Sequence, residues 1–258
     1  MSMFVEERRR IILDQLKQQG RVSVKMLSEL MNVSAVTIRQ DLRALEDNGL
    51  LERTYGGAVR RENNAIPPEL SFHVRLSKNR AEKEAIAAAA AALIQDGCSL
   101  ALDASTTAYA LIPYVKLFKR ITVVTNSLVI AQNFLDSPQI QVLVPGGRLR
   151  RDSISTVGNP EGLPDIHVNV GFFGARGISL IGGCAEIDPD EVAMKSAMIA
   201  RCVSTFVLVD SSKWGQIAPY TFLKPEQIRH VITGEAAPAE LVAEFRERNI
   251  RVDVVTSA

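Results

Sequence analysis

Four short polar segments of the chain each follow an apolar run typical of a β-strand. They are Asp103–Thr107, Asn126–Ser127, Gly146–Arg148 and Asp210–Lys213. Hydroxyls and free backbone N–H groups at the start of a helix bind phosphate readily, and Arg and Lys side chains add positive charge. Any one of these segments is also explained by a helix cap, a tight turn or a surface ion pair. Together, the four favour a site for a small anionic ligand.

A second group of residues with recognisable chemistry lies near the N-terminus. The spacing of Ile38, Leu42 and Leu45 predicts an amphipathic helix over residues 35–48, capped by Ser34. Burial of these three leaves polar side chains on the other faces of the helix: Thr37, Arg39, Gln40 and Arg43. In a major groove, Arg pairs well with guanine and Gln with adenine. We therefore expect this helix to contact base edges, with Ser34 and Thr37 close to phosphate oxygens.

The segments around this helix predict a winged helix-turn-helix. Helical patterns over Glu6–Gln19 and residues 24–31 precede it, and two short strands around Gly56–Gly57 follow it. Cations and one aromatic ring fall on this predicted wing, where we expect contact with the DNA backbone: Arg53, Tyr55, Arg60 and Arg61. Charged residues on a single helix usually form only a solvated face. Three capped helices followed by a basic wing favour DNA binding instead.

Helical and strand patterns alternate in the rest of the chain. The prolines of Asn63–Pro68 break regular structure, so we expect a linker at 62–80 between a head, 1–61, and a body, 81–258. Strands are predicted at Ser99–Leu102, Ile121–Thr125, Ile140–Val144, Val168–Phe173, Thr205–Val209, His230–Thr233 and Arg251–Val255. Helices are predicted at residues 81–95, 107–116, 191–201 and 239–248, with another ending at Phe134. This order predicts an α/β fold with a mainly parallel sheet, whose strand ends would bring the four polar segments together.

Composition and charge narrow the class of protein. The chain has 258 residues, of which 47% are hydrophobic and 23% charged, which excludes wholesale disorder. The smooth apolar run 85–94 is too short to span a bilayer and no signal-peptide core is recognisable, so we expect a cytoplasmic protein without membrane contact. The scattered Cys and His residues predict no metal site. Residues 1–61 carry a net charge of +3 and residues 62–258 a net charge of −2, so the head alone is expected to meet a polyanion.

Arg21–Ala58 resembles the DNA-binding head of the DeoR family of bacterial transcription regulators. The resemblance rests on the segment Val33–Leu42 and on the glycine pair of the wing. Gln40 stands where the family often has a basic residue, and Tyr55 where it often has His. The first of these departures can alter which operator bases are preferred.

The body, from about Pro68 to Val255, resembles the effector domain of the same family. The matching segments are Leu102–Thr107, Val123–Leu128, Gly146–Arg150, Glu191–Ile199 and Val209–Gly215. That domain is similar in fold to ribose-5-phosphate isomerase and usually senses a phosphorylated sugar. The resemblance implies that Ser105, Thr106 and Thr107 hold the phosphate, and that Asp103, Asp210 and Lys213 meet the sugar. It also brings in Arg148, Glu191 and Lys195, although the last two lie at i, i+4 on a helix, where a plain salt bridge explains them equally well.

One departure in the body bears on the reaction class. Gly174–Gly177 includes Arg176 where the family usually carries Asp, and the related isomerases keep an acid in this region. A carboxylate is a suitable base for enediol formation and Arg is not, so the exchange argues against isomerase chemistry. We expect Arg176 to face the pocket and to select an effector with an additional anionic group, such as a sugar acid or a second phosphate.

These observations predict a DNA-binding repressor of carbohydrate genes that senses a phosphorylated sugar or sugar acid. We expect double-stranded operator DNA as its partner, a homodimer or homotetramer on repeated half-sites, no cofactor and no catalytic residue. The alternative is a sugar-phosphate isomerase-like enzyme with an appended head, in which Asp103, Glu191, Asp210 and Lys213 supply acid and base groups. A third possibility, a scaffold that uses the head for protein contacts, leaves the phosphate-site pattern without a purpose.

Overall fold

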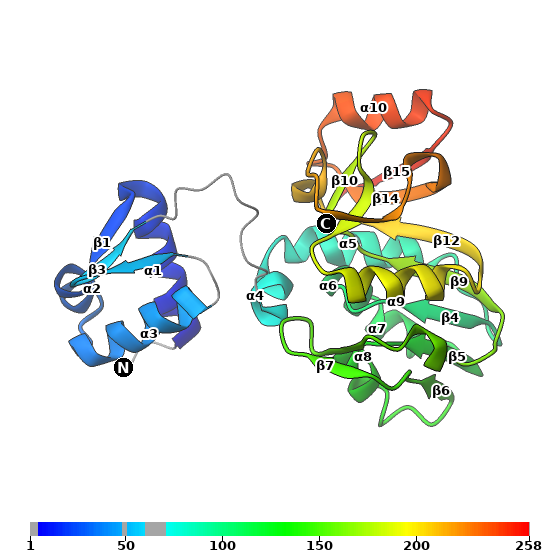
Figure 1. Cartoon of the computed structure of the whole chain (residues 1–258), viewed down its shortest axis with the longest axis horizontal. Helices are drawn as coiled ribbons and strands as arrows, with labels where there is room; N and C mark the ends of the chain where they lie inside the picture. Colours follow the sequence, from blue (N-terminus) through cyan, green and yellow to red (C-terminus); the bar gives the residue numbers. More distant parts are fainter. Residues whose placement is uncertain (1–4, 48–50, 60–70, 258) are drawn as a thin grey trace. The chain divides into compact units, whose positions relative to one another are not determined.

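A computed structural model describes residues 5–47, 51–59 and 71–257 (Figure 1). The chain divides into two compact units, residues 1–71 and 72–258, called here the N-terminal and C-terminal units. Four positions used in the sequence predictions, Asn48, Gly49, Arg60 and Arg61, lie outside the described residues. Residues 62–70 of the predicted linker lie outside them as well.

The N-terminal unit is a winged helix-turn-helix, as predicted. Its elements in chain order are α1 (Val5–Gln19), β1 (Arg21–Ser23), α2 (Val24–Met31), α3 (Ala35–Asp47), β2 (Glu52–Thr54) and β3 (Gly57–Val59). The strands form an antiparallel sheet in the order β1-β3-β2. The apolar stripe of α3, formed by Ile38, Leu42 and Leu45, is buried against α1 and α2. Strand β1 was not predicted, because three residues are too few to show a periodic pattern.

The wing of this unit depends on a close backbone approach at Gly57. A Cβ atom at this position would lie 2.1 Å from the carbonyl oxygen of Val22, so no side chain fits where β3 pairs with β1. Gly56 before it has a positive φ of 96°, a conformation that favours glycine. The Gly-Gly pair is therefore required by the geometry of the turn.

A seven-stranded, entirely parallel sheet forms the centre of the C-terminal unit. The strand order is β15-β14-β12-β9-β4-β5-β6. The strands are β4 (Ser99–Leu102), β5 (Ile121–Thr125), β6 (Ile140–Leu143), β9 (Val168–Phe173), β12 (Cys202–Leu208), β14 (His230–Gly234) and β15 (Arg251–Val255). All seven agree with predicted strands to within three residues at each end. This confirms the predicted α/β fold with a parallel sheet.

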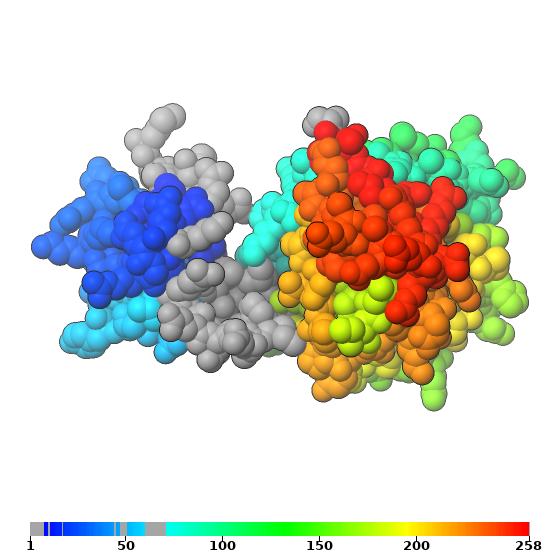
Figure 2. Space-filling model, turned by 90° about the horizontal axis from the view of Figure 1, so that it is seen from above, coloured from blue at the N-terminus to red at the C-terminus, as the bar shows by residue number. Residues whose placement is uncertain are grey.

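Helices and a smaller sheet cover the two faces of the parallel sheet. One face packs on α5 (Arg80–Ala91), α6 (Thr106–Tyr109), α7 (Ile112–Val115) and α8 (Leu128–Asn133). The other packs on α9 (Pro189–Ile199), α10 (Ala239–Glu247) and an antiparallel sheet of β10 (Gly177–Ser179), β11 (Gly183–Glu186) and β13 (Tyr220–Leu223). Neighbouring strand residues such as Phe172 and Phe173 enter opposite cores, as alternation requires. In Figure 2, residues toward the C-terminus, orange and red, cover much of the visible face of the C-terminal unit.

Within the C-terminal unit, the structure differs from the predicted elements at several places, of which three bear on the site. The predicted linker extends too far, because α4 (Phe72–Ser77) lies within it and its Phe72 is buried against Tyr109 of the C-terminal unit. The single helix predicted over 107–116 is two helices, α6 and α7, since Pro113 has no N–H to continue the first. The hairpin of β7 (Arg148–Arg150) and β8 (Ser155–Val157) was not predicted, because each strand has only three residues.

Candidate functional site

Helix α3 presents a polar face suited to the major groove. The Ser34 hydroxyl accepts a hydrogen bond from the Thr37 N–H at 3.1 Å and caps the helix, as predicted. With the apolar stripe buried, Arg39, Gln40 and Arg43 are exposed on the other side of the helix. These three carry the donors that can contact base edges, and Thr37 is half-buried beside the cap.

A buried ion pair fixes α3 against α1. The carboxylate of Asp41 is only 2% exposed and accepts hydrogen bonds from Arg8 at 2.8 Å and Arg9 at 3.3 Å, both on α1. Asp41 lies on the side of α3 away from Arg39 and Arg43, so its pairing orients the exposed face. Sequence reasoning missed this pair, because nothing in the local spacing relates Asp41 to α1.

The wing residues occupy two different environments. Tyr55 is fully exposed at the turn between β2 and β3. Arg53 instead donates to Glu46 of α3 at 2.6 Å, and this hydrogen bond holds the pKa of Glu46 below its usual value. Contact between the Arg53 guanidinium and a phosphate would therefore have to compete with Glu46.

In the C-terminal unit, Asp103 is the centre of a buried polar cluster. It follows β4 and is fully buried. Its carboxylate accepts from the Ser105 N–H at 3.1 Å and from the Gly174 N–H at 2.9 Å, so it joins the loops after β4 and β9. A Cβ at Gly174 would lie 2.4 Å from that of Ser105, which shows how close these loops are. The first predicted segment, after β4, therefore meets the loop after β9 that carries Arg176, at the carboxyl ends of adjacent strands.

Lys195 of α9 lies beneath this cluster with its hydrogen-bonding capacity filled. It is 1% exposed and donates to the carbonyl of Gly174 at 2.9 Å and to Glu186 at 2.6 Å, and its ammonium lies 2.9 Å from Asp103. The two carboxylates raise its pKa, against the opposing effect of burial. An ammonium has three N–H donors, and all three have protein acceptors here. The salt bridge to Glu191 that the i, i+4 spacing predicted is the longest of its contacts, at 4.0 Å.

The predicted phosphate segment starts the short helix α6. The Ser105 hydroxyl caps it by accepting from the Ala108 N–H at 3.1 Å. Thr106 and Thr107 are both about 5% exposed, so their hydroxyls lie within the fold. A ligand phosphate would reach the Ser105 hydroxyl more readily than either Thr in this conformation.

The loop after β12 carries Asp210 and Lys213. Asp210 is buried, and its carboxylate accepts from Asn79 at 2.9 Å and from the Ser212 N–H at 3.1 Å. Burial works to raise the pKa of Asp210, but Lys213 and these hydrogen bonds lower it overall. The carboxylate is therefore ionised at neutral pH, as an anchor for nearby cations.

Four cationic side chains influence one another near this loop: Arg75, Lys78, Arg176 and Lys213. Burial lowers the pKa of Lys213, an effect that Asp210 opposes, and Arg176 and Arg75 lower it further. Burial also lowers the pKa of Lys78, and the positive charge of Arg176 lowers it further. Burial likewise lowers the pKa of Arg176, and the positive charge of Arg75 adds to this effect. Repulsion of this kind is relieved when an anion binds among the cations. We call these four residues the cation cluster.

Arg148 does not join the cation cluster. It is exposed on β7 and pairs with Asp190 at 2.5 Å. Two residues further along the strand, Arg150 is buried and forms ion pairs with Glu191 and Asp188. The segment Gly146–Arg150 resembles the family's effector domain, but the sequence did not reveal that Arg150 is buried and Arg148 is not.

Comparisons with known proteins decide the family. Residues 8–64 match the model of the DeoR-like helix-turn-helix domain, and residues 78–235 match that of the DeoR C terminal sensor domain. The chain belongs to the DeoR family of transcriptional regulators. Among its relatives, the regulator GolR of Listeria innocua is 32% identical, with 98% of this chain and 99% of that protein covered. The glycerol-3-phosphate regulon repressor of Escherichia coli is 29% identical, with 94% and 96% covered. The repressor GlcR of Bacillus subtilis is 32% identical, with 96% and 95% covered.

These three relatives are transcriptional regulators. They give no support to the alternative of a sugar-phosphate isomerase-like enzyme. Among solved structures, ribose 5-phosphate isomerase A from Methanocaldococcus jannaschii is 16% identical, with 59% of each chain covered and a TM-score of 0.39. The tetrameric eIF2B-beta2-delta2 complex from C. thermophilum gives 13%, with 83% and 74% covered and a TM-score of 0.42. Similarities this weak do not by themselves identify a common fold.

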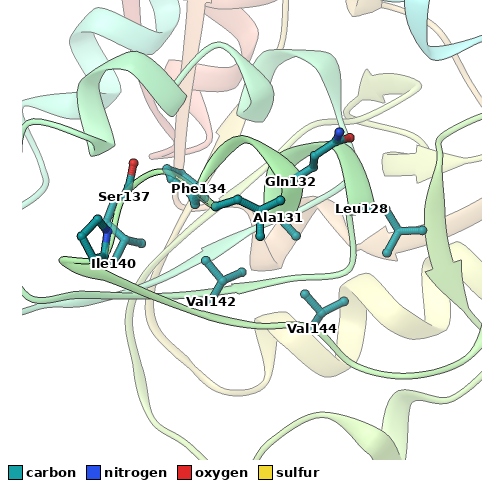
Figure 3. Close-up of a pocket in the computed structure, with 10 residues that line it drawn as sticks. Leu128, Ala131, Gln132, Phe134, Ser137, Ile140, Val142 and Val144 are labelled. Carbon is teal, nitrogen blue, oxygen red and sulfur yellow. The ribbon is translucent and has the colours of Figure 1, made fainter.

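The described residues of this regulator offer neither a membrane-spanning helix nor a metal site. No helix among the described residues is long and apolar enough to cross a membrane, and those residues contain no group of three His, Cys, Asp or Glu able to hold a metal. A groove of about 550 Å³ lies between α8 and β6 (Figure 3), lined by Leu128, Ala131, Gln132, Phe134, Leu135, Ser137, Pro138, Ile140, Val142 and Val144. Its described lining is mostly apolar and includes none of the predicted effector residues.

Proposed function

We propose that this DeoR-family regulator is a repressor of carbohydrate-metabolism genes whose operator binding is modulated by a phosphorylated sugar or sugar acid. Two relatives that are repressors, the glycerol-3-phosphate regulon repressor and GlcR, support the direction of regulation. Since the target is chromosomal DNA, we place the protein in the cytoplasm. A single winged head contacts one half-site, so we also propose a homodimer or homotetramer on repeated half-sites.

The observation that carries the effector class is the cation cluster beside Asp210. A single phosphate is satisfied by one or two cations and a few N–H donors. The four cations come from separate segments, α4, the turn after it, the loop after β9 and the loop after β12, so they can meet more than one anionic group. We therefore propose that the effector carries two separated anionic groups, one near Ser105 and one near Arg176.

The proposed roles of the remaining residues follow from their contacts. Ser105 and the start of α6, with Thr106 and Thr107 behind it, would hold the phosphate, while Asp210 and Lys213 would meet the sugar. Asp103 and Lys195 would hold the surrounding loops in place, because their own hydrogen bonds are already made within the protein. Arg148 is a weaker candidate for effector binding than Arg176, because Arg148 is exposed and paired with Asp190.

The test is operator release by a panel of small compounds. Full-length protein is bound at fixed salt to labelled DNA from the promoter beside its own gene, against a random-sequence competitor. Glycerol 3-phosphate, fructose 1,6-bisphosphate and 6-phosphogluconate are then added. We expect a compound with two anionic groups to release the DNA, and Arg176→Asp to shift the preference toward glycerol 3-phosphate. Release by glycerol 3-phosphate alone in the wild type would refute the two-anion proposal, and absence of specific DNA binding would refute the regulator.

A further inference from the structure

The junction between α4 and α5 is tied to the loop that follows β12. α4 ends at Ser77 and α5 begins at Arg80. The loop residue Asp210 lies 131 positions beyond Asn79 in the chain, yet their side chains are in direct contact. Three residues make the connection, each by a different contact. They are Asn79 at the N-cap of α5 and Glu82 and Lys83 in its first turn.

Asn79 uses its side chain on the loop instead of on its own helix. It stands at the N-cap of α5, where an Asn side chain usually accepts from the first turn, but here it makes no such cap. It adopts a left-handed conformation with φ of 50°, and its amide donates to Asp210 at 2.9 Å. A favourable cap is thus exchanged for a contact with the proposed effector loop.

Glu82 binds the next residue of the same loop twice. Its carboxylate accepts from the Ser211 N–H at 2.6 Å and from the Ser211 hydroxyl at 3.0 Å. The Glu82 side chain reaches the loop across the end of β14, where a Cβ at Gly234 would lie 2.2 Å from it. Glycine at that position leaves the space that this contact requires.

Lys83 joins α4 to Asp210. Its buried ammonium donates to two backbone carbonyls, that of Arg75 at 2.5 Å and that of Lys78 at 2.6 Å. The first lies in the last turn of α4 and the second directly follows the helix. It also lies 4.0 Å from Asp210. The same positive charge therefore caps α4 and faces the effector loop, so a change at one of these places alters its balance at the other.

Helix α4 also touches the other half of the proposed site. Phe72 packs edge-on against Tyr109 of α6, with ring centroids 5.5 Å apart, and its N–H donates to the Asp152 carbonyl at 2.7 Å. α6 is the helix that Ser105 caps. In sequence, α4 is the first described element after the segment that leads from the N-terminal unit. A displacement of either effector loop would thus be felt by the element closest in the chain to the DNA-binding unit.

We infer that Asn79, Glu82 and Lys83 are positioning residues that couple the effector loop 210–213 to α4, and through α4 to the chain leading to the DNA-binding unit. The inference rests on the proposed effector function, since it describes how that site signals. A ligand that contacts Asp210 and Lys213 changes the field and position of the loop. Asn79 and Glu82 hold the loop against the start of α5, and the shared cation of Lys83 transmits the change to α4, a helix of only six residues. A ligand alters DNA binding only if the two states of such an element bind it unequally.

The experiment combines hydrogen–deuterium exchange with operator binding on the full chain. The probes are glycerol 3-phosphate, fructose 1,6-bisphosphate and 6-phosphogluconate. In the wild type, the bound probe should slow exchange in both 210–213 and 72–77 and weaken operator binding about tenfold, within the usual range of allosteric coupling. In Lys83→Met, the probe, added at a concentration that saturates the variant, should still protect 210–213. Residues 72–77 should no longer respond, and the loss of operator affinity should fall below about twofold.

Two further variants make the result decisive. Asn79→Gly keeps the positive φ but removes the amide, so it tests the same connection if Lys83→Met folds poorly. Lys116→Met removes a lysine whose pair with Asp136 is exposed, and it should behave as the wild type.

Each outcome separates the coupling from the effector function. A probe that protects 210–213 in the wild type without affecting 72–77, or full release in both junction variants, would overturn the coupling alone. If no probe protects 103–107 or 210–213, the proposed effector function fails, and the inference falls with it.

Discussion

The substitution Lys195→Met should strongly destabilise the C-terminal unit. The ammonium is 1% exposed and lies 2.9 Å from Asp103 and 2.6 Å from Glu186. Met preserves most of the length and apolar volume of the side chain, so the main change is the loss of a charge between two buried carboxylates. Removing one partner of a buried ion pair costs about 3–5 kcal/mol, because the other charge is left uncompensated.

The contacts of the two carboxylates place the expected loss within that range. Asp103 would keep its hydrogen bonds from the Ser105 and Gly174 N–H groups, which continue to stabilise its charge. Glu186 would lose the closest of the cationic contacts described for it. We therefore expect a loss of about 3 kcal/mol in the free energy of unfolding at neutral pH. For a unit of this size, that corresponds to a fall in Tm of roughly 6–12 °C.

Urea denaturation followed by tryptophan fluorescence measures this loss. The single Trp of the chain, Trp214, is buried in the C-terminal unit and reports on that unit alone. Lys116→Met is the matched control, and its exposed pair predicts no measurable change. A loss below about 1 kcal/mol would show that Lys195 is not the counter-charge of this cluster.

Three other changes test separate parts of the structure. Arg39→Ala should cost about 1–3 kcal/mol at the cognate operator and much less on random DNA, as measured by fluorescence anisotropy; an equal loss on both would reassign Arg39 to phosphate contact. Gly57→Ala should abolish operator binding while leaving the C-terminal unit's unfolding transition unchanged, because the new Cβ would lie 2.1 Å from the Val22 oxygen. Burial lowers the pKa of Lys83 to about 8 from 10.5. The unfolded chain therefore binds the proton more tightly, so stability should rise with pH between about 8 and 10.5 in the wild type relative to Lys83→Met; parallel urea profiles in that window would contradict this.

The centre of the parallel sheet was predictable because its strands are buried on both faces. Such strands are nearly continuous apolar runs, and the predicted Ser99–Leu102 and Ile121–Thr125 correspond directly to β4 and β5. Helix α3 was predictable for a different reason. Its buried residues recur at helical spacing and Ser34 marks its start, so its start and its exposed face follow from local pattern.

The parts that escaped prediction depend on contacts between distant segments. The i, i+4 spacing paired Lys195 with Glu191, but the closer carboxylates come from β11 and from the loop after β4. Strand alternation puts Arg148 and Arg150 on the same side of β7, so it could not predict that only Arg150 is buried. Helix α4 is too short to show a periodic pattern, so its contribution of Arg75 to the cation cluster could not be recognised before the fold was known.

The proposed effector site divides into a fixed base and an adjustable rim, and this division suits a sensor. Lys195 and Asp103 are fully buried and make their hydrogen bonds within the protein, so they hold the loops whether or not a ligand is bound. The rim is different, because burial and the neighbouring Arg176 and Arg75 lower the pKa of Lys213, although Asp210 and Glu186 oppose them. An anion that binds there adds a favourable interaction that the free protein lacks. We expect the resulting free-energy difference to bias α4, and hence operator binding, because contacts within the protein already hold the base.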